Sequence, residues 1–80
     1  MINYTHSFKT GRQYDTTQVI EYVEAENKGG QLFNEMVYQC RDESRNMRFQ
    51  VEVMIFDLDD RQEIEDSILE AYDNGNYSNI

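Results

Sequence analysis

The side chains best able to do chemistry in this 80-residue chain are carboxylates crowded into one segment near its end. Residues 57–73 hold eight of the sixteen acids and one base, Arg61, so this segment carries −7 of the net charge of −9. Such a density of carboxylates could ligate a cation, exchange protons as an acid/base pair, or present an anionic surface to a basic partner. The acids are Asp57, Asp59, Asp60, Glu63, Glu65, Asp66, Glu70 and Asp73.

The start of this segment, Asp57-Leu58-Asp59, is similar to the start of a calcium-binding loop. Counted from Asp57, however, the fifth residue is Arg61, the sixth is Gln62 where glycine is needed, and the twelfth is Ile68 where glutamate is needed. These departures exclude an EF-hand. Weak divalent binding by the three early aspartates stays open, but we expect no dedicated metal site and no cofactor.

Catalysis is not expected from the remaining reactive side chains. Cys40 could be a nucleophile only beside a base, and nothing in the sequence pairs it with His6, the one histidine. One cysteine and one histidine are also too few to hold zinc. Paired carboxylates need a pocket that separates their pKa values, and a chain of this length leaves little room for one. We therefore expect a protein that is not an enzyme.

Composition narrows the partner. A pI near 4.3 argues against direct binding to nucleic acid or to an anionic membrane, because like charges repel, and favours a basic protein. The lone Cys40 fits a reducing cytoplasm, and the sequence has neither a secretory signal pattern nor an apolar run near the roughly 18 residues of a membrane span.

Alternating and clustered apolar residues predict the elements that position the acids. Residues 2–9 alternate as a strand and are followed by a turn at Thr10-Gly11. Residues 14–26 are rich in β-branched side chains, which favours a strand, but Asp15 and Gln18 resemble a helix capping box, so a helix stays open. Residues 32–40 form the third predicted strand, and 41–46 a polar turn.

The fourth predicted strand gives the clearest pattern. Its apolar residues at alternate positions define one face: Phe49, Val51, Val53 and Ile55. Met54 and Phe56 make the far end apolar on both sides, which predicts a central strand covered there on both faces.

A helix follows. Asp60 and Glu63 form a plausible capping box, and Asn74-Gly75 is a usual stop. The side chains spaced to face the sheet are Ile64, Ile68, Ala71 and Tyr72. The sequence thus predicts a single α+β domain over residues 1–75, an antiparallel meander of about four strands with the C-terminal helix packed on one face, and a frayed tail over 76–80.

The helix would hold its acids on the side away from the sheet. Glu63, Asp66, Glu70 and Asp73 fall within a sector of about 80° and extend along roughly 15 Å. Duplex DNA carries one charge per roughly 1.7 Å, so the helix is sparser but of comparable order. Only Arg61 and Glu65 could form a balancing pair on the helix. A solvated face that serves solubility is the alternative.

Tyrosines could add apolar contact area to this surface, because they are enriched at interfaces. We expect Tyr14, Tyr22 and Tyr77 to be exposed. Arginines at 41, 45 and 48 could pair with Asp42 and Glu43, or form a basic patch through which the chain associates as a homodimer.

In size, acidity and expected α+β build, the chain resembles the small inhibitors that phages and mobile elements direct against host defence, namely anti-CRISPR and anti-restriction proteins. Many of these act as DNA mimics. The resemblance implies a non-enzymatic inhibitor in the host cytoplasm that blocks the nucleic-acid-binding surface of a defence nuclease or complex. The alternative is a structural or regulatory subunit that associates through its sheet edge or apolar face.

Overall fold

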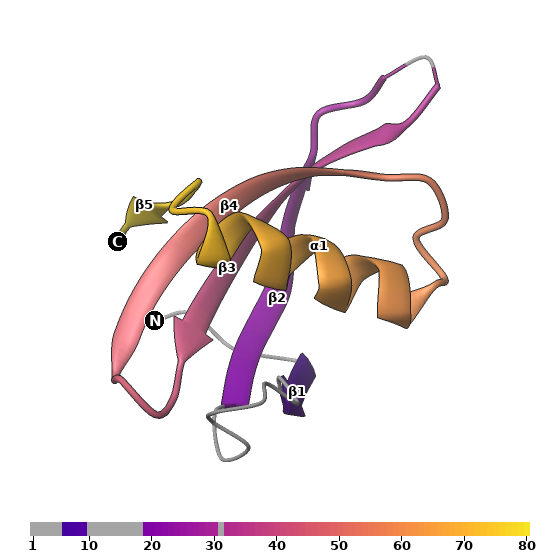
Figure 1. Cartoon of the computed structure of the whole chain (residues 1–80). Coiled ribbons are helices and arrows are strands. Elements are labelled where there is room, and N and C mark those ends of the chain that lie inside the picture. Colours follow the sequence, from indigo (N-terminus) through magenta and orange to yellow (C-terminus); the bar gives the residue numbers. More distant parts are fainter. Residues whose placement is uncertain (1–5, 10–18, 31) are drawn as a thin grey trace.

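The fold is a meander of antiparallel strands with one helix across it (Figure 1). The computed structural model describes residues 6–9, 19–30 and 32–80. The sheet order in this part of the chain is β1-β2-β3-β4-β5, the same as the chain order. The predicted α+β meander with a C-terminal helix is therefore confirmed. The elements are β1 (His6–Lys9), β2 (Val19–Asn27), β3 (Asn34–Asp42), β4 (Met47–Ile55), α1 (Arg61–Asp73) and β5 (Ser78–Asn79).

The ambiguous second segment is a strand. In β2 the side chains of Ile20 and Tyr22 are fully buried and their neighbours are not, which is the two-residue period of a strand. A helix over 19–27 is therefore wrong; residues 15–18 lie outside the described residues. The hairpin to β3 turns at Gly29, whose φ of +80° suits glycine, and the Asn27 side chain accepts the Gly29 N–H at 2.8 Å.

The third and fourth strands carry most of the core. β3 and β4 pair without interruption over nine residues each. Phe49, Val51 and Ile55 are buried, as the alternation in β4 predicts. The prediction for the far end of β4 is wrong: Met54 is 61% exposed and Phe56 is 71% exposed. The reason is that α1 covers one face of the sheet only, so side chains on the other face meet no second layer of the described chain.

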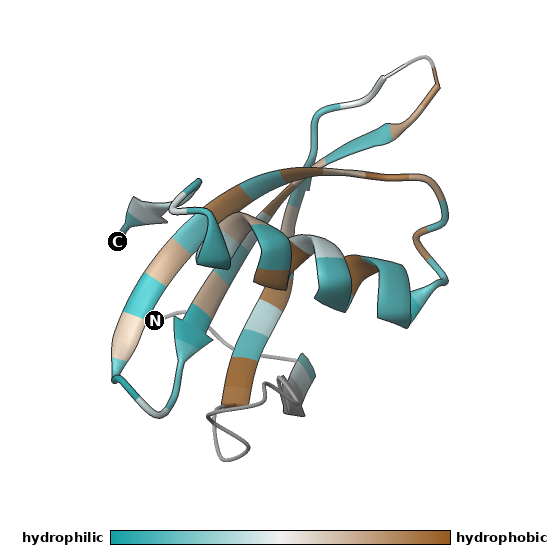
Figure 2. Cartoon of the chain, in the orientation of Figure 1, coloured by the Kyte–Doolittle hydropathy of each residue, from teal (hydrophilic) through white to brown (hydrophobic). Residues whose placement is uncertain are grey.

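The helix buries the predicted apolar side. Ile64, Ile68, Ala71 and Tyr72 are buried, and the Tyr72 ring stacks on Phe49 with centroids 4.3 Å apart. Figure 2 shows hydrophobic residues recurring along α1 between hydrophilic ones. Asp60 is the N-cap, and the chain leaves the helix through Asn74 and Gly75, which has a φ of +76°.

The tail at 76–80 differs from the expected frayed end. Ser78–Asn79 pairs with β4, and the Ile80 N–H donates to the Arg48 carbonyl at 3.2 Å. The Tyr77 ring lies 5.1 Å from Tyr72 between centroids, so an aromatic side chain anchors the segment to the core. The sequence of the tail does not predict a strand, because its pairing with β4 depends on where the rest of the fold places it.

In the ranges that the structure describes, no helix combines the length and the apolar character that crossing a membrane requires.

Candidate protein-binding surface

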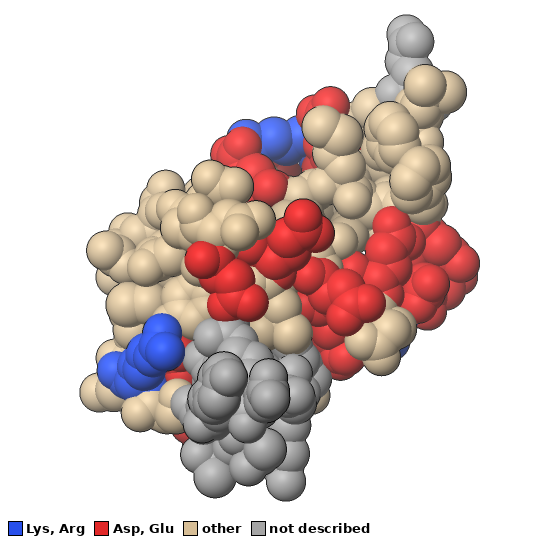
Figure 3. Space-filling view, in the orientation of Figure 1, with Lys and Arg blue, Asp and Glu red and all other residues tan. Residues whose placement is uncertain are grey.

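The carboxylates of the late segment gather on the outer side of α1 and on the loop before it (Figure 3). Because Ile64, Ile68 and Ala71 turn toward the sheet, the opposite side of the helix faces solvent. Six of the predicted acids are exposed there, and we call them the acidic face. They are Asp57, Asp59, Asp60, Asp66, Glu70 and Asp73.

Glu63, which was predicted as part of this surface, does something else. Its two carboxylate oxygens accept the backbone N–H groups of Phe56 at 2.7 Å and Asp57 at 3.0 Å. It therefore closes the β4–α1 connection, reaching beyond the Asp60 N–H that a standard capping box would use. The half-buried Glu63 side chain therefore holds the loop in place, and both of its carboxylate oxygens accept hydrogen bonds there.

Asp57 and Asp60 of the acidic face also accept hydrogen bonds within the loop and at the start of the helix. Asp60 accepts the Glu63 N–H at 3.2 Å as the N-cap, and Asp57 accepts the Asp59 N–H at 2.9 Å. A carboxylate has about four acceptor sites, so one such bond leaves most of its capacity for a partner. The positive end of the helix dipole offsets part of the repulsion among these early acids.

Three bases among the described residues contact groups other than the acidic face. Lys28 pairs with Glu52 at 3.3 Å, and Arg41 pairs with Glu21 at 2.9 Å, both within the sheet. Arg61, the one base of the acidic segment, places its guanidinium against the His6 ring. Asp66 accepts an uncharged donor, the Gln62 amide, at 2.9 Å. The negative charge of the acidic face is therefore visible over α1 in Figure 3, with Lys and Arg mostly at the margins of this view.

Burial and a neighbouring charge together shift the pKa of Glu65. Partial burial raises the pKa of this carboxyl first, and the neighbouring Asp66 charge raises it further, against the opposing effect of Arg61. Glu65 is half-buried at the side of α1 and was not among the predicted binding residues.

The tyrosine prediction is wrong for Tyr22 and outside the described residues for Tyr14. Tyr22 is fully buried, with its ring 5.5 Å from Tyr38 in an edge-to-face contact. Tyr77 is partly buried against Phe49 and Tyr72. Tyr22 follows Ile20 by two residues, so in the strand β2 both side chains point to the buried side.

Several large apolar side chains are exposed, although the sequence did not predict them as binding residues. Leu32 is 81% exposed, and with Met54 and Phe56 it lies at the end of the sheet that leads into the acidic loop. The Phe56 ring contacts Phe33 at 4.5 Å between centroids. The available signal was the run Met54-Ile55-Phe56 directly before Asp57, which was assigned to the core.

Cys40 and His6 are not brought into a catalytic arrangement. Cys40 is fully buried, and burial raises the pKa of its thiol from 9.0 to about 12, so the thiol is protonated at neutral pH. His6 instead packs on Tyr22, with ring centroids 5.2 Å apart. Cys40 is therefore a small buried side chain of the core.

Within residues 6–9, 19–30 and 32–80, no three His, Cys, Asp or Glu side chains are grouped so that they could hold a metal ion. The weak cation site left open for Asp57, Asp59 and Asp60 therefore gains no support. Comparisons with protein-family models, with curated proteins and with solved structures give no match to this chain.

Proposed function

We propose that this protein is a non-enzymatic binding protein whose acidic face occupies the nucleic-acid-binding surface of a basic partner. The observation that carries the proposal is the placement of six exposed carboxylates on the solvent side of α1 and its preceding loop. The partner class is a DNA- or RNA-handling protein such as a host defence nuclease or complex, in line with the resemblance to anti-CRISPR and anti-restriction inhibitors.

The physical basis is electrostatic complementarity. Lysine and arginine side chains that neutralise phosphates would pair with Asp66 and Glu70 on the helix and with Asp59 on the loop. Such pairs accelerate encounter and weaken as salt rises, since the Debye length shrinks from about 10 Å at 0.1 M to about 3 Å at 1 M. The helix fixes the spacing of its carboxylates in advance, which lowers the entropy lost on binding.

A competition experiment tests this. The protein is immobilised and exposed to a nuclease-treated cell lysate, and bound proteins are then eluted with a short DNA duplex. We expect nucleic-acid-handling proteins to elute with the duplex. A variant with Asp59→Lys, Asp66→Lys and Glu70→Lys should fail to capture them.

The matched control reverses three exposed acids elsewhere, with Glu24→Lys, Glu26→Lys and Glu43→Lys, and so carries the same net charge. If this control still captures the proteins and the variant of the acidic face does not, the acidic face is the binding surface. Equal loss in both variants would mean that net charge acts without a specific surface. Retention of bound proteins in the presence of excess duplex would exclude the mimic.

A second candidate, a structural or regulatory subunit, is favoured by a different observation. Leu32, Met54 and Phe56 are all more than half exposed, which is apolar area that a subunit interface could cover. In that case Met54→Ser with Phe56→Ser would release the partner, and the three lysine substitutions on the acidic face would not.

A further inference from the structure

The outer edge of β4 is open along half its length. In the part of the chain that the structure describes, β5 pairs only with Phe49 and Gln50, and no strand continues beyond them. The Arg48 carbonyl accepts from Ile80, so the backbone of Arg48 faces this edge. Alternate residues face the same edge in an antiparallel strand, and Glu52 and Met54 therefore turn their N–H and C=O groups outward.

This edge lacks most of the usual protections. Its pairing with β3 is continuous, without a bulge, and it contains no proline. Natural edge strands are commonly bulged, shortened or covered, because exposed N–H and C=O groups are a template for another strand. Glu52 alone places a charge among the last five residues of β4, and it pairs with Lys28 across the sheet.

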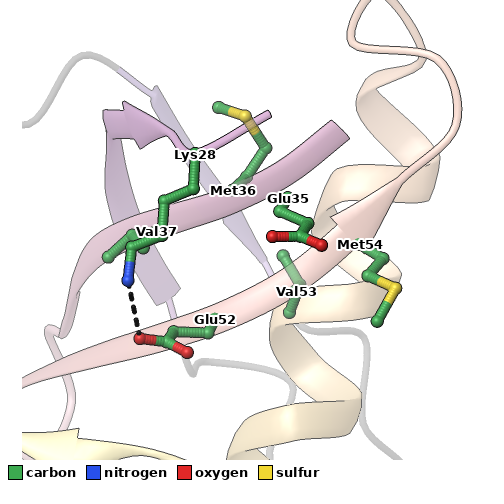
Figure 4. Close-up of a pocket in the computed structure, with 7 residues that line it drawn as sticks. All are labelled: Lys28, Glu35, Met36, Val37, Glu52, Val53 and Met54. Atoms are coloured by element: carbon green, nitrogen blue, oxygen red, sulfur yellow. Dashed lines mark hydrogen bonds and ion pairs between the residues drawn. The ribbon is translucent and has the colours of Figure 1, made fainter. Parts of the chain in front are cut away.

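Two hollows lie along the last residues of β4, one beside α1 and one over β3, and both are lined by Val53 and Met54. One, of about 250 Å³, lies between β4 and the last turns of α1, where Ser67, Glu70 and Ala71 line it. The other, of about 310 Å³, lies toward β3 and the end of β2 (Figure 4). In that view Lys28 reaches Glu52 at one end, while Glu35 and Met54 lie at the other.

We propose that the open edge of β4 binds an extended, lysine- or arginine-bearing segment of the partner as an added strand. This inference rests on the proposed function and adds a binding mode to it. Backbone groups of Glu52 and Met54 supply the hydrogen bonds, as in other cases of strand addition. Side chains of the added strand alternate between its two faces, so those on one face meet the hollow beside α1 and those on the other lie next to Glu52 and Met54.

Charge complementarity selects this occupant. An added strand meets Glu70 from α1 on one side, and Glu52 of β4 on the other. The apolar floor of Val53 and Ala71 suits the aliphatic stems of lysine or arginine. A second copy of this chain is disfavoured, since it carries the same net charge of −9 and would set Glu52 and Glu70 against their own equivalents.

The test uses a synthetic peptide of about six residues, the usual length of a strand, that alternates lysine with valine. Binding is followed by amide hydrogen exchange of the protein. We expect slower exchange at Glu52 and Met54, and no effect from a peptide with glutamate in place of lysine. Met54→Pro removes the outward N–H without breaking pairing to β3, so affinity should fall about tenfold or more relative to Met54→Ala.

Equal peptide affinity of the proline and alanine variants would overturn strand addition, and so would protection confined to α1. Dimerisation of the wild-type chain that Met54→Pro abolishes would make a second copy the occupant, which also overturns it. If the proline variant fails to fold, the exchange pattern of the wild-type chain decides alone. Capture of partner proteins from the lysate separates the two proposals. If capture is lost in the triple lysine variant of the acidic face but kept in Met54→Pro, only the added strand is overturned. Protection of Glu52 and Met54 without DNA-displaceable capture overturns only the mimic.

Discussion

The phenol of Tyr72 on α1 donates a hydrogen bond of 2.9 Å to the fully buried carboxylate of Asp42 at the end of β3. The other oxygen of Asp42 accepts the Ser44 hydroxyl at 2.7 Å and the Ser44 N–H at 3.1 Å. Arg45 lies beside both, 3.8 Å from Asp42 and 3.3 Å from the Tyr72 oxygen. One carboxylate thus joins the β3–β4 turn to the end of the helix. Arg45 pairs with Asp42, one of the two roles that the sequence left open for it.

Tyr72→Phe should destabilise the fold more than Tyr38→Phe, although each change removes one phenolic oxygen. A hydrogen bond to a charged group contributes about 1.5–3 kcal/mol, and its loss at Tyr72 leaves the Asp42 carboxylate less satisfied. The Tyr38 hydroxyl is buried with no hydrogen-bond partner among the described residues, so its removal should be neutral or stabilising. Urea unfolding midpoints measure both. An equal loss in the two variants would contradict the role of the Asp42–Tyr72 bond.

Stability should fall steeply in alkali. Burial raises the pKa of Tyr38 from 10.0 to about 12 and that of Cys40 from 9.0 to about 12, and burial first, then the bond to Asp42, raises that of Tyr72. The folded chain then holds protons that the unfolded chain has released, so the free energy of unfolding decreases with rising pH. The stabilisation is complete below pH 9 and lost progressively toward pH 12.

Tyrosinate absorbance and circular dichroism, followed together against pH, check this prediction. The absorbance of the buried tyrosines should rise together with the loss of native dichroism. Full ionisation in a chain that keeps its native dichroism would show that these phenols are accessible, which is the contrary outcome.

Sequence periodicity was sufficient for β3, β4 and α1, left β2 open between strand and helix, and was insufficient for β5 and for the surface. The alternation in β4 and the spacing of Ile64, Ile68 and Ala71 depend on local geometry, so the sequence alone predicted their buried sides. The exposure of Met54 depends on whether a second layer covers the sheet, and the anchoring of Tyr77 depends on where the helix ends. Both features depend on tertiary structure, which a local sequence pattern does not determine. Glu63 is a further example. Helical spacing predicted the side of the helix on which it lies, but not that its carboxylate accepts the N–H groups of Phe56 and Asp57.

The Cys40 thiol should react only when the protein unfolds. It is fully buried, its pKa is raised to about 12, and the thiolate is the reactive form. Alkylation in the native state should therefore follow the global unfolding equilibrium, and increasing urea should raise the rate in parallel with the unfolded fraction. A Cys40→Ala variant serves as the blank for the assay. Rapid alkylation in native buffer, independent of urea, would indicate local opening around β3.

Glu63→Gln and Asp66→Asn each remove one negative charge from α1. We expect the first to reduce mainly the stability of the fold and the second to reduce mainly binding. Loss of the Glu63 carboxylate weakens the bonds to the N–H groups of Phe56 and Asp57, and a change in such a capping contact costs about 1 kcal/mol. Asp66 is exposed and accepts only the Gln62 amide in its surroundings on α1, so its replacement should alter stability by no more than about 0.5 kcal/mol. Retention on immobilised polylysine should show the reverse order, with Asp66→Asn eluting at lower salt than Glu63→Gln. Equal elution of the two variants would mean that net charge, rather than its display on the acidic face, governs the interaction.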